Sequence, residues 1–239
     1  MTTKNKIILA LDVSSEGEAV DLVKELKDCV GAFKIGFELF TSTGPKIFES
    51  VRNAGAEKIF FDSKFHDIPN TVAGAARAAA RMGVWMFNVH ATGGSAMMRA
   101  AADAAADEAH RLGMETPLII GVTVLTSISS KMLHDELSVP VLLENQVVHL
   151  ARLSQNAGLN GVVASPQEIK SVKSACGPKF LVVTPGVRPT WAAANDQKRI
   201  MTPSEAVKAG ADYMVIGRAI TAADDKRAAA ERIISEVEG

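Results

Sequence analysis

The sequence predicts a single (β/α)₈ barrel over residues 1–239, and three observations support this fold class. Eight apolar, strand-like runs alternate with eight helical patterns, the order expected of a parallel sheet covered by helices. A chain of 239 residues has the length of eight such units closed into one barrel. No low-complexity linker divides the chain. A doubly wound open sheet is the alternative, although no Gly-x-Gly-x-x-Gly follows the first strand, which disfavours a dinucleotide-binding sheet.

The strands are predicted from short apolar runs bounded by turn residues. The first run is Lys-Ile-Ile-Leu-Ala-Leu-Asp-Val, which ends in a polar residue at Asp12. The third begins at Ile59-Phe60-Phe61 and leads into a charged segment. The eight expected strands cover residues 6–13, 32–39, the run that opens at 59, 85–90, 117–124, 161–165, 180–184 and 212–216.

The helices are predicted from apolar residues spaced three and four apart and from their start and stop signals. Ser14-Ser15 precedes the first helix, and Gly113 follows the fourth. The alanine runs at 73–80 and 100–106 fit helices, since alanine is the best helix former. The expected helices cover residues 16–29, 44–55, 70–82, 94–112, 141–157, 166–175, 203–209 and 222–237.

Two connections are longer than the usual strand-to-helix loop, from Thr126 to Pro140 and from Pro185 to Thr202. The second is expected to close over a ligand, because long loops in compact domains often act as lids. It carries a cluster of polar side chains: Arg188, Asn195, Asp196, Gln197, Lys198 and Arg199.

The composition, with 47% hydrophobic and 22% charged residues, is that of a globular protein with one large core. The formal net charge of −1 provides no field that would attract nucleic acid or an anionic membrane. No signal peptide is recognised, and no apolar run approaches the roughly 20 residues of a membrane span. Cys29 and Cys176 fit neither a metal site nor a disulfide framework, so a cytoplasmic location is expected.

Polar and charged residues gather where the predicted strands end. In a (β/α)₈ barrel the active site forms at the C-terminal ends of the strands, so these side chains are expected around one rim. Gly217-Arg218 lies after the eighth strand, where barrels commonly bind phosphate through a helix N-terminus and an arginine. The strand-end residues are Asp12, Lys34, Asp62, Lys64, Asn88, His90, Thr126, Ser127, Arg188, Gly217 and Arg218.

The third strand carries the most informative segment. Because side chains alternate along a strand, Asp62 and Lys64 are expected to point to the same side. Charges on a buried strand cost free energy unless they pair or take part in chemistry. Asp67 follows, just before Pro69, where a helix can start. The structural alternative is a buried ion pair followed by an aspartate that caps a helix.

The segment 61–71, Phe-Asp-Ser-Lys-Phe-His-Asp-Ile-Pro-Asn-Thr, resembles the Asp-x-Lys-x-x-Asp-Ile-Pro-x-Thr signature of the orotidine 5′-monophosphate decarboxylase family. The resemblance extends over the whole chain, and the departure is Asn195, where an acidic residue is expected before Asp196-Gln197. The other matching segments are Leu11-Asp12, Phe33-Lys34-Ile35-Gly36, Leu125-Thr126-Ser127, Thr184-Pro185-Gly186-Val187-Arg188-Pro189 and Ile216-Gly217-Arg218.

The resemblance implies decarboxylation of orotidine 5′-monophosphate to uridine 5′-monophosphate, the last step of pyrimidine nucleotide synthesis, without a metal or a cofactor. It assigns catalysis to an alternating array of Lys34, Asp62, Lys64 and Asp67. Lys64 would protonate C6 of the pyrimidine, Asp62 would lie against the departing carboxylate, and Lys34 would hold the array and contact the ribose. A fixed cation beside the carbanion at C6 suits this chemistry.

The resemblance also implies the substrate contacts and a homodimer. Asp67, Ile68 and Thr71 would reach into the neighbouring subunit's site. Asp12 would bind the ribose hydroxyls, and Thr126 or Ser127 would meet the pyrimidine edge, with Thr126 favoured. The phosphate would be held by Arg188, Gln197, Gly217 and Arg218.

Three other functions compete with this interpretation. Mg²⁺-dependent sugar-phosphate decarboxylases and hexulose-phosphate synthases share Asp-x-Lys-x-x-Asp, but they need an acidic residue where the second strand here carries Lys34. A Schiff-base aldolase needs an uncharged lysine, which Asp62 and Asp67 would oppose at Lys64. A non-catalytic protein that binds nucleotide phosphates would be expected to lack a member of the charged array, and none is missing.

Overall fold

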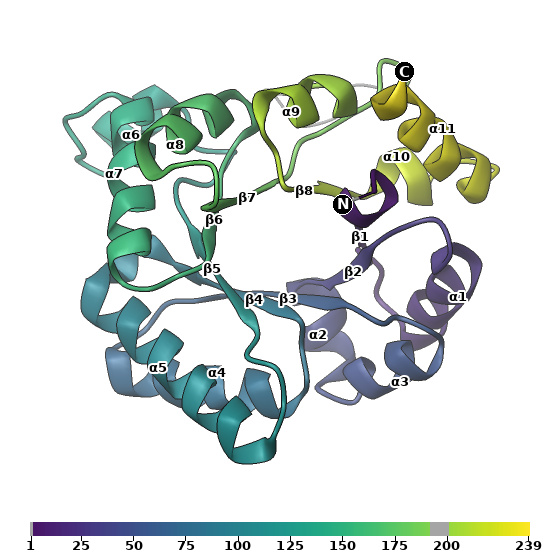
Figure 1. Cartoon of the computed structure of the whole chain (residues 1–239), viewed down its shortest axis with the longest axis horizontal. Coiled ribbons are helices and arrows are strands. Elements are labelled where there is room, and N and C mark those ends of the chain that lie inside the picture. The colour runs from purple at the N-terminus through teal and green to yellow at the C-terminus, as the bar shows by residue number, and fades with distance from the viewer. Residues whose placement is uncertain (1, 192–200) are drawn as a thin grey trace.

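The computed structural model describes residues 2–191 and 201–239, and in it eight parallel strands close into a barrel in sequence order (Figure 1). The (β/α)₈ prediction is therefore confirmed. The open sheet is excluded because the last strand pairs with the first, with Ile8 opposite Val215 and Leu9 opposite Ile216. The strands are β1 (Ile7–Ala10), β2 (Ala32–Ile35), β3 (Ile59–Phe65), β4 (Met86–His90), β5 (Leu118–Val122), β6 (Gly161–Val163), β7 (Leu181–Thr184) and β8 (Tyr213–Ile216).

The helices form a ring outside the barrel (Figure 1). Two of them, at 94–112 and 203–209, have the bounds expected from the sequence. The α-helices are α1 (Glu16–Leu26), α2 (Phe37–Thr43), α3 (Ile47–Asn53), α4 (Pro69–Arg81), α5 (Gly94–Leu112), α6 (Ser130–Asp135), α7 (Leu143–Asn156), α8 (Ile169–Cys176), α9 (Pro203–Ala209), α10 (Arg218–Thr221) and α11 (Lys226–Glu238). Short 3₁₀ turns are η1 (Lys4–Lys6), η2 (Ala91–Gly93) and η3 (Pro166–Glu168).

The expectation of a strand over residues 32–39 was wrong in its second half. The pairing of β2 with β3 ends at Ile35 opposite Phe61, and helix α2 begins two residues later. A short apolar run is compatible with strand or helix, and tertiary packing decides between them. Here Leu39 is buried while Phe37 is 56% exposed, the one-sided burial of a surface helix.

Two further helices were missed. The connection between Thr126 and Pro140 contains α6, whose N-cap Ser129 side chain accepts a hydrogen bond from the Met132 N–H. The closing helix, expected over 222–237, is α11, and the side chain of its N-cap Asp225 accepts from the Ala228 N–H; the short helix α10 before it was not expected. The first N–H groups of a helix have no acceptor within the helix, and a capping side chain supplies one. Even the six-residue helix α6 can therefore form within a segment that reads as a loop.

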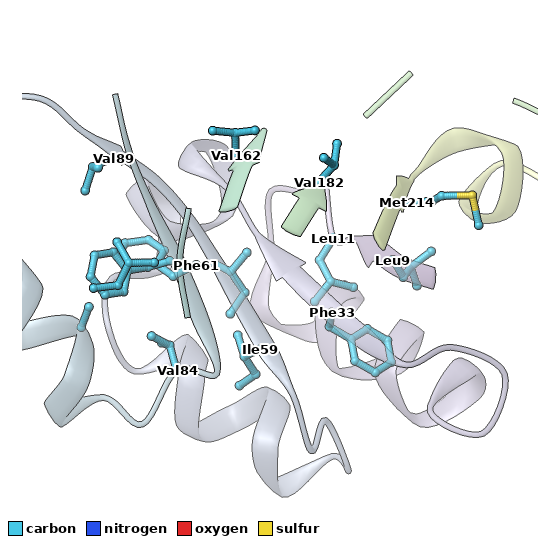
Figure 2. Close-up of a cluster of buried hydrophobic side chains, with 14 of the residues drawn as sticks. Leu9, Leu11, Phe33, Ile59, Phe61, Val84, Val89, Val162, Val182 and Met214 are labelled. Atoms are coloured by element: carbon cyan, nitrogen blue, oxygen red, sulfur yellow. The ribbon is translucent and has the colours of Figure 1, made fainter. Parts of the chain in front are cut away.

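The core lies in two layers, because successive residues of each strand face opposite sides of the barrel wall. The outer layer, between strands and helices, includes Leu9, Phe33, Phe61 and Met214 (Figure 2). The inner layer fills the barrel with the side chains of Ile8, Ala32, Phe60, Met86, Ile120, Val183 and Tyr213. The apolar inner layer leaves the C-terminal rim of the strands as the place for polar chemistry.

Candidate active site

A cavity opens at the C-terminal ends of the strands. It is bounded by apolar side chains from several strands, among them Val122, Val163 and Val215. The sequence-predicted residues that line it are Asp12, Lys34, Asp62, Lys64, Thr126, Arg188, Gly217 and Arg218. The barrel thus brings together residues from positions 12 to 218 that the sequence singled out separately.

The charged side chains at one side of the cavity alternate in sign. Lys64 Nζ lies 2.6 Å from Asp62 Oδ1, and Lys34 Nζ lies 3.5 Å from Asp62 Oδ2. Lys34 Nζ lies closer still to Asp12 Oδ1, at 2.9 Å. Within one chain the array is therefore Asp12, Lys34, Asp62 and Lys64. Lys34 is 7% exposed, so its charge is removed from most of the solvent and is balanced by the two carboxylates.

Glycine makes room for this arrangement. A Cβ atom at Gly36 would lie 2.9 Å from Lys34 Nζ, closer than real Cβ contacts come. Gly36, which lies between the end of β2 and the start of α2, therefore has no side chain where that of Lys34 passes on its way to Asp12.

Asp62 stays ionised in this setting. Burial alone would raise its pKa, but the ammonium groups of Lys34 and Lys64, with hydrogen bonds from Lys64 and Asn88, hold the pKa below its ordinary value. The site therefore keeps a carboxylate and two ammonium groups fixed within one small region. Such fixed charges are available to a transition state without first being ordered.

The backbone of β3 is irregular where the charges lie. Phe61 pairs with Phe87 and Phe65 with Val89, so four residues of β3 advance against two of β4. Lys64 has φ 44°, in the left-handed region that non-glycine residues seldom adopt. Both Asp62 and Lys64 face the cavity as the strand alternation predicted, but a bulge, not a regular strand, presents them.

The lining of the cavity also includes candidate phosphate ligands. Gly217 immediately precedes helix α10, and Arg218 is the first residue of that helix. Arg188, near the start of the loop that follows β7, lines the same cavity. A Cβ at Gly217 would lie 3.4 Å from the Ala10 Cβ and 3.7 Å from Asp12 Oδ2, so Gly217 lies beside the first strand and Asp12. Thr126 lines the cavity beside Leu125.

Three of the predicted site residues lie elsewhere in the single chain. Asp67, Ile68 and Thr71 are exposed at the start of α4 and do not line the cavity. Ile68 is 66% exposed, and its N–H donates to Asp67 Oδ1 at 2.6 Å. The predicted residue Gln197, with Asn195 and Asp196, lies outside the described residues.

Two residues lie against the array without a specific role assigned to them from the sequence: Asn88, which was counted only among the strand-end residues, and Phe37. Asn88, fully buried in β4, donates to Asp62 Oδ1 at 2.7 Å through Nδ2 and accepts from the Lys64 N–H through Oδ1 at 2.6 Å. Phe37 places its ring 5.5 Å from Lys64 Nζ. The sequence does contain a signal for Asn88: it is an asparagine within the apolar run Trp-Met-Phe-Asn-Val, and a buried amide needs hydrogen-bond partners.

Within residues 2–191 and 201–239, no three His, Cys, Asp or Glu side chains are grouped as ligands of a metal ion. The helices of the same part of the chain include none with the length and apolarity required to cross a membrane.

Comparison with known proteins gives one consistent result. Residues 5–233 match the model of the "Orotidine 5'-phosphate decarboxylase / HUMPS family". Orotidine 5′-phosphate decarboxylase of Syntrophomonas wolfei is 51% identical over 239 residues, covering 100% of both chains, and that of Moorella thermoacetica is 52% identical over 100% of this chain and 94% of its own. The crystal structure of orotidine 5′-phosphate decarboxylase from Lactobacillus acidophilus superposes with a TM-score of 0.86 at 37% identity, covering 98% of this chain and 99% of the other.

Proposed function

Because this chain belongs to the orotidine 5′-phosphate decarboxylase / HUMPS family and converts orotidine 5′-monophosphate to uridine 5′-monophosphate, we propose that its charged array performs the decarboxylation without a metal ion or a cofactor. The observation that carries the proposal is the position of Asp62, whose two carboxylate oxygens face Lys64 at 2.6 Å and Lys34 at 3.5 Å inside the cavity. The cavity therefore holds charges of both signs in fixed positions before any substrate binds, which makes it a preorganised electrostatic site.

The chemistry follows from these charges. The bond between C6 and the carboxylate breaks, carbon dioxide leaves, and the electron pair remains on C6. The Lys64 ammonium stabilises this carbanion and then transfers a proton to C6, which completes uridine 5′-monophosphate. Asp62 lies against the departing carboxylate, and Lys34 keeps Asp62 ionised. Lys64 is left as a neutral amine, and the proton that it has given to C6 is replaced from solvent in each turnover.

The rest of the cavity binds the parts of the substrate that do not react. Arg188, Gly217 and Arg218, with Gln197, hold the phosphate, since arginine forks and a helix N-terminus both favour an anion. Asp12 accepts hydrogen bonds from the ribose hydroxyls, and Thr126 bonds the pyrimidine edge. Binding energy from the remote phosphate offsets the cost of placing the substrate carboxylate near Asp62.

The ammonium of Lys34 argues against a metal at this site. Mg²⁺ requires carboxylates that are free to coordinate it. Asp12 and Asp62, the carboxylates that line the cavity on this side, both face Lys34 at 2.9 and 3.5 Å. A divalent cation would have to displace that lysine. This favours the decarboxylase over the Mg²⁺-dependent sugar-phosphate enzymes that share Asp-x-Lys-x-x-Asp.

The working enzyme in this proposal is a cytoplasmic homodimer of single-domain subunits. Asp67, Ile68 and Thr71 are exposed beside the cavity-lining strand β3, where a partner subunit can receive them. Asp67 then completes the alternating array of the neighbouring site. Free thiols at Cys29 and Cys176 suit a reducing compartment.

The test is an ultraviolet assay of orotidine 5′-monophosphate consumption by the purified protein, with and without EDTA. We expect equal rates in both. Lys64→Ala should reduce turnover by at least about 10³-fold, since it removes both the cation and the proton donor. Lys131→Ala, which removes an exposed lysine paired with Asp135 on α6, should keep the wild-type rate. A rate that depends on added Mg²⁺ would disprove the metal-free mechanism.

A further inference from the structure

Asn88 is a buried amide in β4, the strand beside β3 (Figure 1). Its side chain joins two members of the array: Nδ2–H donates to Asp62 Oδ1 at 2.7 Å, and Oδ1 accepts from the Lys64 backbone N–H at 2.6 Å. We propose that Asn88 is a positioning residue that holds Asp62 and Lys64 in the geometry needed for decarboxylation. This inference rests on the proposed function of the array.

The bulge in β3 explains why such a residue is needed. Four residues of β3 lie against two of β4 between Phe61 and Phe65, so the regular ladder is interrupted at Lys64. The Lys64 N–H therefore donates to the Asn88 side chain and not to the backbone of β4. The left-handed φ of 44° at Lys64 directs the lysine side chain into the cavity. A backbone conformation of this kind persists only where the surroundings hold it.

An asparagine matches both partners, and in one orientation only. The Lys64 N–H can only donate, and the ionised Asp62 carboxylate can only accept. The carbonyl oxygen of the amide must therefore face Lys64 and its nitrogen must face Asp62. Aspartate would place a second acceptor against Asp62, and leucine, similar in size, would leave the half-buried Lys64 N–H without this partner.

The amide also holds Asp62 through the reaction. Asp62 Oδ1 accepts from both Lys64 Nζ and Asn88 Nδ2, at 2.6 and 2.7 Å. When Lys64 gives its proton to C6, its attraction for Asp62 weakens because the amine is neutral. The Asn88 donor does not titrate, so it keeps that oxygen in place together with Lys34 on the other oxygen.

Asn88 acts through its neighbours and does not touch the ligand. It is fully buried and is absent from the residues that line the cavity. Its loss should therefore change kcat without an equal change in affinity for uridine 5′-monophosphate. A residue that served only general packing would weaken the fold and the binding site together.

The experiment compares Asn88→Asp with wild type for kcat, the Kd of uridine 5′-monophosphate and the pH profile of kcat. We expect kcat to fall at least about 30-fold while the product Kd changes by less than about threefold. The acid limb of the profile should move to higher pH, because a carboxyl group in place of the amide donor raises the pKa of Asp62 against the effect of Lys34 and Lys64.

Two more variants make the test decisive. Ser63→Ala removes the hydrogen bond from the buried Ser63 Oγ to the Asn88 carbonyl (2.8 Å), between the same two strands, and should change kcat by less than about threefold. Asn88→Ser adds no charge and should also lower kcat selectively, which covers the case in which Asn88→Asp does not fold. A wild-type kcat in Asn88→Ser, or equal losses of kcat and product affinity, would overturn the inference. An inactive wild-type enzyme would instead overturn the proposed function.

Discussion

Lys34 Nζ lies 2.9 Å from Asp12 Oδ1, closer than the 3.5 Å that separates it from Asp62. Asp12 is thus an ionic partner of the array as well as the expected ribose ligand. The two carboxylates differ in setting, since the Asp12 side chain is 60% exposed and that of Asp62 is 16% exposed. An exposed carboxylate can turn to a ligand at little cost, while a buried one is held by its neighbours.

The first prediction concerns Asp12→Asn. The amide keeps the size of the side chain but loses the charge that is proposed to bind the ribose hydroxyls, so we expect KM to rise about 10- to 100-fold with a smaller change in kcat. Steady-state kinetics will measure both. Asp21→Asn is the matched control, because it removes an equal charge from an exposed helix residue 3.9 Å from Lys24. A collapse of kcat at unchanged KM would assign Asp12 to the reacting charges.

The second prediction concerns Arg218→Ala. Loss of the guanidinium at the start of α10 should weaken binding of uridine 5′-monophosphate by about 10- to 100-fold, since hydrogen bonds between charged groups are the stronger kind. Isothermal titration calorimetry will give the Kd. Arg227→Ala, whose Nη1 donates to the Glu25 carbonyl at 2.8 Å on the outside of the barrel, should bind product as wild type does. Unchanged affinity in Arg218→Ala would refute the phosphate assignment.

The third prediction tests the proposal that each active site is shared between two subunits. Lys64→Ala and Asp67→Ala should each be nearly inactive, but a mixture that exchanges subunits should recover up to about a quarter of wild-type activity. When equal amounts of the two variants exchange at random, half of the dimers contain one subunit of each. In each of these dimers one of the two sites has an intact Lys64 from one subunit and an intact Asp67 from the other. If Asp67 served its own subunit, both sites of a mixed dimer would be defective and no activity would return.

The fourth prediction concerns stability, away from the active site. Glu108 on α5 accepts hydrogen bonds from Arg111 at 2.7 Å and from Arg81 on α4 at 3.0 Å, and these bonds lower its pKa to about 2. A carboxyl whose folded pKa lies below its unfolded value of about 4.3 stabilises the fold above that pH, and the contribution is lost as pH falls toward about 2. Glu108→Gln should therefore lower Tm at pH 7 and converge with wild type in acid.

Glu236 provides a control of opposite sign for this measurement. Burial raises the pKa of Glu236, so its ionisation opposes folding as pH rises through the normal range of a glutamate. Glu236→Gln should raise Tm at pH 7 or leave it unchanged. Thermal unfolding followed from pH 3 to pH 7 separates the two variants, and a pH-independent loss in Glu108→Gln would show that its ion pairs do not contribute.

The misses in the predicted fold have a common cause. The run Phe37-Glu38-Leu39 suits a strand or a helix by local pattern, and the end of β2 pairing at Ile35 decides for the helix. Helices α6 and α10 have six and four residues, too short for a periodic pattern to be recognised. By contrast, the 19 residues of α5 repeat their apolar spacing over several turns. Gly113 follows the last of them as the C-cap, so both bounds of this helix were predicted.

The sequence alone determined the alternation of strands and helices, the charges at the strand ends and the glycine-arginine pair after the last strand. These are local properties, since a few neighbouring residues specify each of them. The tertiary structure decided that β8 closes on β1, that Lys34 pairs with Asp12, 22 residues away, and that Asn88 bonds Asp62, 26 residues away. Contacts between distant segments depend on how the whole chain packs, and no local pattern of residue types specifies which partners will meet.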